Sequence, residues 1–137
     1  MCLLISLIVG LTTIHRGLAQ NSPEIVFAKI IQGFTPQGSS EIFTMNSDGS
    51  NQTMLTSGSD SAFSPSWSPN RTQIVFVADT DGDDDVYIMN SNGTGVIKLT
   101  NNTVMDSDPA WSPDGSKIAF ESFNGRYMDI YSINPDG

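Results

Sequence analysis

Two segments decide the fold, Pro109-Ala-Trp-Ser-Pro-Asp-Gly115 and Asp129-Ile-Tyr-Ser-Ile-Asn-Pro-Asp-Gly137, because both recur earlier in the chain. The first recurs as Pro65-Ser-Trp-Ser-Pro69. The second recurs as Glu41-Ile-Phe-Thr-Met-Asn-Ser-Asp-Gly49 and Asp85-Val-Tyr-Ile-Met-Asn-Ser-Asn-Gly93, always at a spacing of 44 residues. A period of this length indicates a repeat protein in which each repeat is one structural unit.

Each repeat is predicted to form four short antiparallel strands. In the complete repeat we expect them over 62–67, 73–78, 85–89 and 95–99, where β-branched and aromatic residues concentrate. Asn-Gly and Asp-Gly pairs between these runs predict tight hairpin turns with φ above zero at both central residues. No helical apolar period extends over the chain after residue 19. The sequence therefore predicts an all-β fold, a β-propeller of four-stranded antiparallel blades.

The predicted blades do not make a closed ring. Residues 61–100 form a complete blade, 24–56 a partial blade without its first strand, and 105–137 a partial blade without its fourth. About 2.5 blades are thus present, whereas a propeller needs about 4 to 8. We therefore expect the chain to be a fragment of a longer protein, the alternative being that several chains close the ring.

Residues that keep the 44-residue register are interpreted as structural markers of the repeat. Trp67 and Trp111 are expected between neighbouring blades, where a large ring fills the space between two sheets. The other markers are prolines, glycines, aromatic residues and one aspartate at the turns and strands: Pro69, Pro113, Asp114, Gly115, Phe76, Phe120, Tyr87, Tyr131, Gly49 and Gly93. Asn70 and Arg71 replace the Asp114–Gly115 pair, so we expect a different type of turn there.

The amino terminus has the pattern of a secretory signal peptide. An apolar run over residues 2–14 is shorter than the roughly 20 residues that a membrane-spanning helix needs. Gly17-Leu18-Ala19 then places small residues where a signal peptidase cuts, so 1–19 is predicted to be removed and 20–137 to be the mature protein. No Lys or Arg precedes the run, which leaves an uncleaved anchor as the alternative.

Composition and charge exclude several classes of function. The chain of 137 residues carries 15 Asp and Glu against 6 Lys and Arg, a formal net charge of -9. Such an acidic protein repels nucleic-acid phosphates and anionic lipid. Cys2 and His15, the single Cys and single His, both lie in the predicted signal. The mature chain would thus have no His for a catalytic triad or a metal site, and no catalytic residues are assigned.

An acidic stretch, 79–85, is the candidate metal site. A Ca²⁺ ion could be held by Asp79, Asp81, Asp83 and Asp85, because hard cations prefer carboxylate oxygens. The spacing is not that of an EF-hand, and the stretch falls on the turn between the second and third strands. A solvated turn without any cofactor is therefore the favoured interpretation.

Other polar residues have both a functional and a structural interpretation. Asp60, Ser64, Asp106 and Asp108 precede the Trp motifs and could form a carboxylate ring for a cation or a basic peptide, or could bond nearby turn amides instead. Four sequons could accept glycans, or could reflect the Asn- and Thr-rich composition of turns. Their asparagines are Asn51, Asn70, Asn92 and Asn101.

The repeat resembles that of the TolB-type, WD-like β-propellers. Residues 109–137 carry the resemblance most closely, through Pro109, the run from Trp111 to Gly115, and Asp129 to Tyr131. The resemblance implies a periplasmic or cell-envelope protein with protein partners. Similar propellers also form the gating domain of prolyl-oligopeptidase-type peptidases, which is the alternative function. A propeller lyase with a His-held metal is disfavoured because the mature chain would have no His.

The sequence thus predicts an exported, non-catalytic scaffold that binds a protein or peptide partner in the periplasm or outside the cell, and its acidic surface favours a basic partner. After signal cleavage no membrane span and no nucleic-acid partner are expected. The blades would be completed by further blades or by self-association. The candidate surface consists of the loops 33–40, 80–84 and 123–126 together with Asp60 and Asp106.

Overall fold

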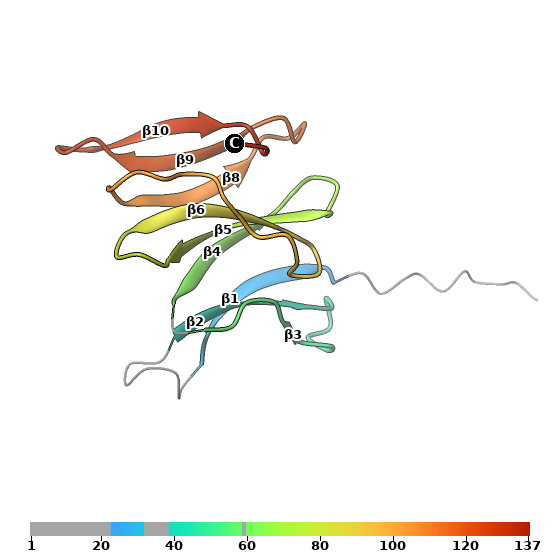
Figure 1. Cartoon of the computed structure of the whole chain (residues 1–137). Coiled ribbons are helices and arrows are strands. Elements are labelled where there is room, and N and C mark those ends of the chain that lie inside the picture. The colour runs from blue at the N-terminus through green and yellow to red at the C-terminus, as the bar shows by residue number, and fades with distance from the viewer. Residues whose placement is uncertain (1–22, 32–38, 59) are drawn as a thin grey trace, which may run out of the picture.

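The computed structural model describes residues 23–31, 39–58 and 60–137, which form ten strands in three antiparallel sheets (Figure 1). The first sheet contains β1 (Ile25–Ile31), β2 (Ser39–Met45) and β3 (Thr53–Met54). The second contains β4 (Ala62–Trp67), β5 (Gln73–Asp79), β6 (Asp84–Asn90) and β7 (Ile97–Lys98). The third contains β8 (Asp106–Trp111), β9 (Ile118–Phe123) and β10 (Met128–Ile133). The predicted all-β class with antiparallel, blade-like sheets is confirmed.

The three sheets stack face to face in an open column (Figure 1). One buried cluster lies between the first and second sheets, where Ile42 packs against Ile74, Phe76 and Met89. A second cluster joins the second and third sheets through Val75, Val86, Ile88, Ile118 and Phe120. β5 and β6 are buried on both faces, because each four-stranded sheet needs a neighbour on either side to cover its apolar residues.

The two tryptophans lie at equivalent places in this stack. Trp67 packs against the first cluster and Trp111 against the second. One stacked aromatic pair also recurs in each sheet, with ring centroids 5.7 Å apart for Phe27–Phe43, 5.7 Å for Phe76–Tyr87 and 6.0 Å for Phe120–Tyr131. In each pair the two rings lie directly opposite each other on the second and third strands of the blade.

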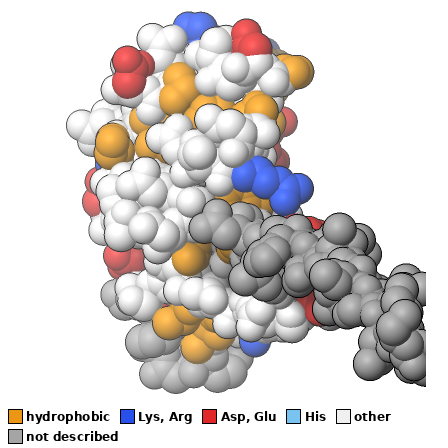
Figure 2. Space-filling view, turned by 90° about the vertical axis from the view of Figure 1, so that its right-hand side faces the viewer, with side chains coloured by type: hydrophobic (Ala, Val, Ile, Leu, Met, Phe, Trp, Pro, Cys, Tyr) orange, Lys and Arg blue, Asp and Glu red, His pale blue; other side chains and the backbone are white. Residues whose placement is uncertain are grey.

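The ends of the column leave apolar side chains exposed. Ile130 is 71% exposed on β10 and Ile30 is 66% exposed on β1. Tyr131 is 46% exposed, whereas the equivalent Tyr87 of the middle sheet is 7% exposed. Figure 2 shows hydrophobic side chains gathered towards the ends of the column on the face in view. Stacking on a neighbour is therefore what buries these positions in the middle sheet.

The turn at Asn70–Arg71 corrects one prediction. It has the same form as the turn at Asp114–Gly115: Arg71 N donates to Ser68 O at 2.9 Å, and Gly115 N donates to Ser112 O at 2.9 Å. Arg71 adopts φ 57° where Gly115 has φ 73°. A different turn type was expected because Arg lacks the conformational freedom of Gly, but the Asn70 side chain replaces the Asp114 side chain bond for bond and retains the geometry.

The hairpin turns between the third and fourth strands also differ from the prediction. Gly49 N donates to Asn46 O and Gly93 N to Asn90 O, and φ is positive at Gly49 (82°) and Gly93 (85°) but not at the preceding residue. These are three-residue loops that end in a left-handed glycine, not two-residue turns with two positive φ angles. The fourth strand is also shorter than the expected 95–99, because Gly95 has φ 66° and cannot continue a strand.

Each first strand contains a bulge at the same place. The pairing of β4 with β5 shifts between Phe63 and Ser66, and the pairing of β8 with β9 shifts between Ser107 and Ala110. Ser64 (φ 48°) and Asp108 (φ 49°) are the left-handed residues within these bulges. Both precede a proline, which cannot donate to the ladder and is tolerated at a bulge.

Candidate binding site at one end of the sheets

The described part of the predicted loop surface lies at one end of the second and third sheets, called the loop end below. It includes the β5–β6 turn at 80–84 and the β9–β10 turn at 123–126, on the left of Figure 1. Asp79 N donates to Ser61 O, and Phe123 N to Met105 O, so the chain that leads into each first strand, with Asp60 and Asp106, reaches the same end. Of the loop predicted at 33–40, residues 33–38 lie outside the described residues.

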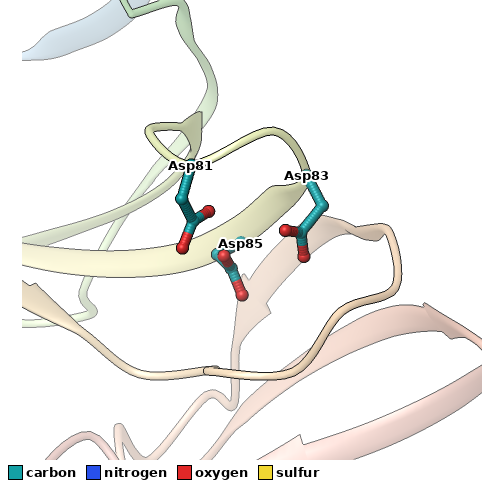
Figure 3. Close-up of side chains that lie close together, drawn as sticks. All are labelled: Asp81, Asp83 and Asp85. Carbon is teal, nitrogen blue, oxygen red and sulfur yellow. The ribbon is translucent and has the colours of Figure 1, made fainter.

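Three carboxylates converge at this end. Asp81, Asp83 and Asp85 each place a carboxylate oxygen within 4.8 Å of the other two (Figure 3). The Lys98 ammonium joins this group, with Nζ 2.8 Å from Asp81 Oδ2 and 2.6 Å from Asp85 Oδ2. Asp79, the fourth candidate ligand, is not part of this group; its Oδ1 accepts a hydrogen bond from Gly82 N at 2.9 Å. Three of the four candidate metal ligands therefore come together, and a lysine lies among them.

The charges at the loop end influence one another. Partial burial and the neighbouring carboxylates of Asp85 and Asp81 raise the pKa of Asp83. Burial and the carboxylate of Asp79 raise the pKa of Asp84 in the same way. Hydrogen bonds to Asp81 and Asp85 raise the pKa of Lys98, so the ammonium stays charged at neutral pH. The carboxylates suit a hard cation. A Ca²⁺ ion on them would have to displace the ammonium.

Sequence analysis missed the contribution of Lys98 and the buried acid–threonine pairs. Asp85 is fully buried, and its Oδ1 accepts a hydrogen bond from Thr100 Oγ1 at 3.0 Å. Glu41, 44 residues earlier, is 1% exposed and accepts one from Thr56 Oγ1 at 2.7 Å. The equal spacing of Leu55-Thr56 and Leu99-Thr100 was the signal that could have revealed these pairs. Lys98 has no counterpart at residue 54, so the period could not reveal it.

The remaining predicted residues occupy distinct environments. Asp106 is fully buried and accepts a hydrogen bond from Asn102 Nδ2 at 2.8 Å. Ser64 Oγ donates to Asp108 Oδ1 at 3.4 Å, which links the second and third sheets. The four sequon asparagines, Asn51, Asn70, Asn92 and Asn101, are all exposed. Two of them are held in local turns, since Thr72 Oγ1 donates to Asn70 Oδ1 and Thr94 Oγ1 to Asn92 Oδ1.

The predicted signal peptide, with Cys2 and His15, lies outside the described residues. Within 23–31, 39–58 and 60–137, no helix has the length and apolar character needed to cross a bilayer.

Repeated antiparallel sheets of three or four strands, stacked through Trp-containing interfaces, define a propeller-type protein, and comparisons specify which type. Residues 34–137 match the family model described as "TolB beta propeller domain". The chain belongs to the TolB β-propeller family.

The first of two similar solved structures agrees at the level of the fold. A structure described as a TolB from Agrobacterium tumefaciens is 24% identical with a TM-score of 0.69, and the match covers 82% of this chain and 42% of that one. A TolB from Acinetobacter baumannii is 17% identical with a TM-score of 0.40, covering 80% of this chain and 39% of that one. The chain thus spans less than half the length of these proteins. None of the curated proteins matches the sequence.

Proposed function

We propose that this chain is a non-catalytic scaffold that binds a basic protein or peptide through the loop end. The acidic loop end carries the proposal: Asp81, Asp83 and Asp84 gather on a rigid stack of sheets, with Lys98 as their basic neighbour. A concentrated negative field steers a cationic partner towards the surface and favours its docking there. The net charge of -9 acts in the same direction.

Membership of the TolB β-propeller family supports a scaffold function. The residues that the repeats share serve packing and turns. The loops between strands are where such folds place their binding residues. The proposal includes export to the periplasm or the outside of the cell, directed by residues 1–19. Intact-mass measurement of the exported protein tests this part, and a mature chain that begins at Gln20 is the expected result.

A pair of matched double variants tests the binding surface. The probe is a 12-residue peptide of alternating Lys and Ala, with alternating Glu and Ala as the negative control. Binding is measured by calorimetry at low and high salt. Asp83→Asn with Asp84→Asn should weaken binding about tenfold, equivalent to about 1.4 kcal/mol.

The control variant removes the same charge from the opposite end. Asp48→Asn with Asp136→Asn alters the turns at 46–50 and 134–137 and should leave binding within about twofold of the wild type. Equal losses in the two double variants would show that binding follows net charge alone. Failure of the wild type to bind the basic peptide would reject the proposed function.

A further inference from the structure

A pocket of about 360 Å³ lies between the first and second sheets. Its apolar lining comes from both sheets and from the segment before β7: Leu55, Ala62, Phe76, Ala78, Tyr87 and Val96. Leu55 packs against the buried cluster that contains Phe76, so the pocket is a gap in the packing between these two sheets. Asp60 and Thr80 also line it, which places the pocket beside the loop end.

Residues with little or no side chain leave this space open. Those in the lining are Gly58, Ala62 and Ala78. The residues 44 positions later in the chain are Asn102, Asp106 and Ser122. Asp106 is fully buried and accepts a hydrogen bond from Asn102 Nδ2 at 2.8 Å. Asp106 lies opposite Ser122 just as Ala62 lies opposite Ala78, so larger polar side chains hold in the third blade the positions at which the second blade is hollow.

The wall of the pocket contains two stacked rings, Phe76 and Tyr87, whose centroids are 5.7 Å apart. The Tyr87 hydroxyl and Thr80 Oγ1 form a hydrogen bond at 2.6 Å. Because these two polar groups satisfy each other, a group that enters the pocket need not supply them with a partner. An aromatic side chain suits this lining, since contacts between rings gain free energy beyond that of the buried area.

The charges around the pocket identify what should flank that side chain. Asp60 lines the pocket, and Thr80 directly precedes the acidic residues of the β5–β6 turn. Among the described residues that line the pocket there is no Lys or Arg. A peptide that places a side chain in the pocket must pass close to these carboxylates, so basic residues on either side of that side chain are favoured.

We propose that an aromatic side chain of a basic partner peptide enters this pocket and packs on Phe76 and Tyr87. The lysines or arginines next to it lie along the acidic loop end. A buried aromatic anchor inside a polar rim is the arrangement in which a few residues supply most of the binding free energy. This inference rests on the proposed function and adds to it an apolar group that charge attraction alone does not require.

The test compares two peptides of equal charge. One is the 12-residue peptide of alternating Lys and Ala, and the other has one central Ala replaced by Phe. The wild type should bind the Phe peptide about tenfold more tightly, because the ring becomes buried in the pocket. Calorimetry measures both affinities, and their ratio is called the Phe preference below.

Two exposed neighbours provide a matched pair of variants. Val96, which is 52% exposed, lines the pocket, whereas Ile97, which is 53% exposed, does not. Val96→Asn should reduce the Phe preference to about twofold, because it replaces apolar lining with a polar amide. Ile97→Asn should keep the preference near tenfold. Thermal unfolding establishes that both variants remain folded.

A further variant fills the pocket with side chains that the third blade already uses. Gly58→Asn with Ala62→Asp copies the bonded pair of Asn102 and Asp106. A Cβ atom at Gly58 would lie 3.8 Å from Asp60 N, its nearest contact beyond the adjoining residues, so a side chain fits there. The filled variant should bind both peptides equally within about twofold. The added Asp does not affect this ratio, because the two peptides carry the same charge.

The outcomes separate the two proposals. A wild type without a Phe preference, or a preference that Val96→Asn and Ile97→Asn retain equally, would overturn the aromatic pocket while a basic partner at the loop end stands. This pair of variants decides the question even if the filled variant does not fold. Failure of the wild type to bind the alternating Lys and Ala peptide would reject the proposed function itself.

Discussion

Ser64 Oγ donates a hydrogen bond to Asp108 Oδ1 across 3.4 Å, although the two residues occupy the same position in successive repeats. Both have left-handed backbones, with φ 48° and 49°, at bulges of the first strands β4 and β8. Equivalent residues of neighbouring blades can touch each other here because β4 and β8 lie side by side. Two residues that are 44 positions apart in the sequence are therefore in contact between neighbouring sheets.

The left-handed conformation of Ser64 predicts the relative effects of Gly and Ala substitutions. Ser64→Gly should have a free energy of unfolding about 0.5 to 1 kcal/mol above that of Ser64→Ala, which also loses the hydrogen bond to Asp108, because glycine adopts a positive φ without the clash of a Cβ atom. Ser66→Gly, two residues further along β4 and without a positive φ, is the matched control and should lower that free energy by a similar amount. Urea unfolding measures all three variants, and a Ser64→Gly variant no more stable than Ser64→Ala would contradict the assigned backbone.

The two equivalent turns predict reciprocal effects of glycine. Arg71→Gly should increase the free energy of unfolding by about 1 kcal/mol, because Arg71 holds φ 57° in the place of a glycine. Gly115→Ala should decrease it by about 1 kcal/mol, since φ is 73° there. Arg71→Ala controls for loss of the Arg side chain. A gain from Arg71→Ala as large as that from Arg71→Gly would show that the backbone is not the cause.

Asp114 predicts a pH dependence of stability. Its carboxylate accepts hydrogen bonds from Ser112 Oγ, Ser116 N and Ser116 Oγ, which lower the pKa of Asp114 from 3.8 to about 2. Because the folded pKa is depressed, the stabilisation is present above pH 3.8 and is lost as the pH falls towards 2.

Asp114→Asn isolates that dependence, because Asn70 accepts the same three bonds in the equivalent turn. The urea midpoint of the wild type should fall relative to that of Asp114→Asn between pH 5 and pH 2. The fall should correspond to the uptake of at most about one additional proton when the wild type unfolds. Asn70→Asp should introduce the same dependence into the second blade. Parallel midpoints of the wild type and Asp114→Asn over this range would refute the assignment.

Lys98 predicts how the acidic cluster responds to Ca²⁺. In the wild type the ammonium lies within 2.8 Å of Asp81 and 2.6 Å of Asp85, so added Ca²⁺ should leave the melting temperature almost unchanged. Lys98→Met should lower the melting temperature, because Asp85 is fully buried and loses its counter-ion. Ca²⁺ should then restore part of that loss, with an affinity at least about tenfold above that of the wild type.

Lys117→Met is the control for this experiment, since Lys117 Nζ bonds Asn134 Oδ1 and no carboxylate of the cluster. It should show no response to Ca²⁺. A wild-type chain that melts at a clearly higher temperature in Ca²⁺ would instead favour cation binding by the acidic stretch 79–85 and contradict the expected block by Lys98.

The repeat, the strands and the family could be predicted from the sequence because their signals are local or periodic. Residue type alone marks a turn or an interface at Pro69, Trp67 and Gly93. Their recurrence at a spacing of 44 residues assigns them to equivalent positions of successive repeats. The turn at Arg71 escaped prediction because the Asn70 side chain, not the residue with positive φ, holds it in shape.

The sequence by itself determined that this protein is built from repeated units of short antiparallel strands, because strand length, turn residues and apolar alternation are properties of short segments. Only the tertiary structure decided which charges meet. Lys98 reaches Asp81 and Asp85 across the sheet, whereas the hydrogen bonds that Glu41 accepts come from Ser39, Thr56 and Gly58, all of them neutral donors. Such pairings depend on distances between strands and on burial, and residues far apart in the chain acquire both only when the sheets pack.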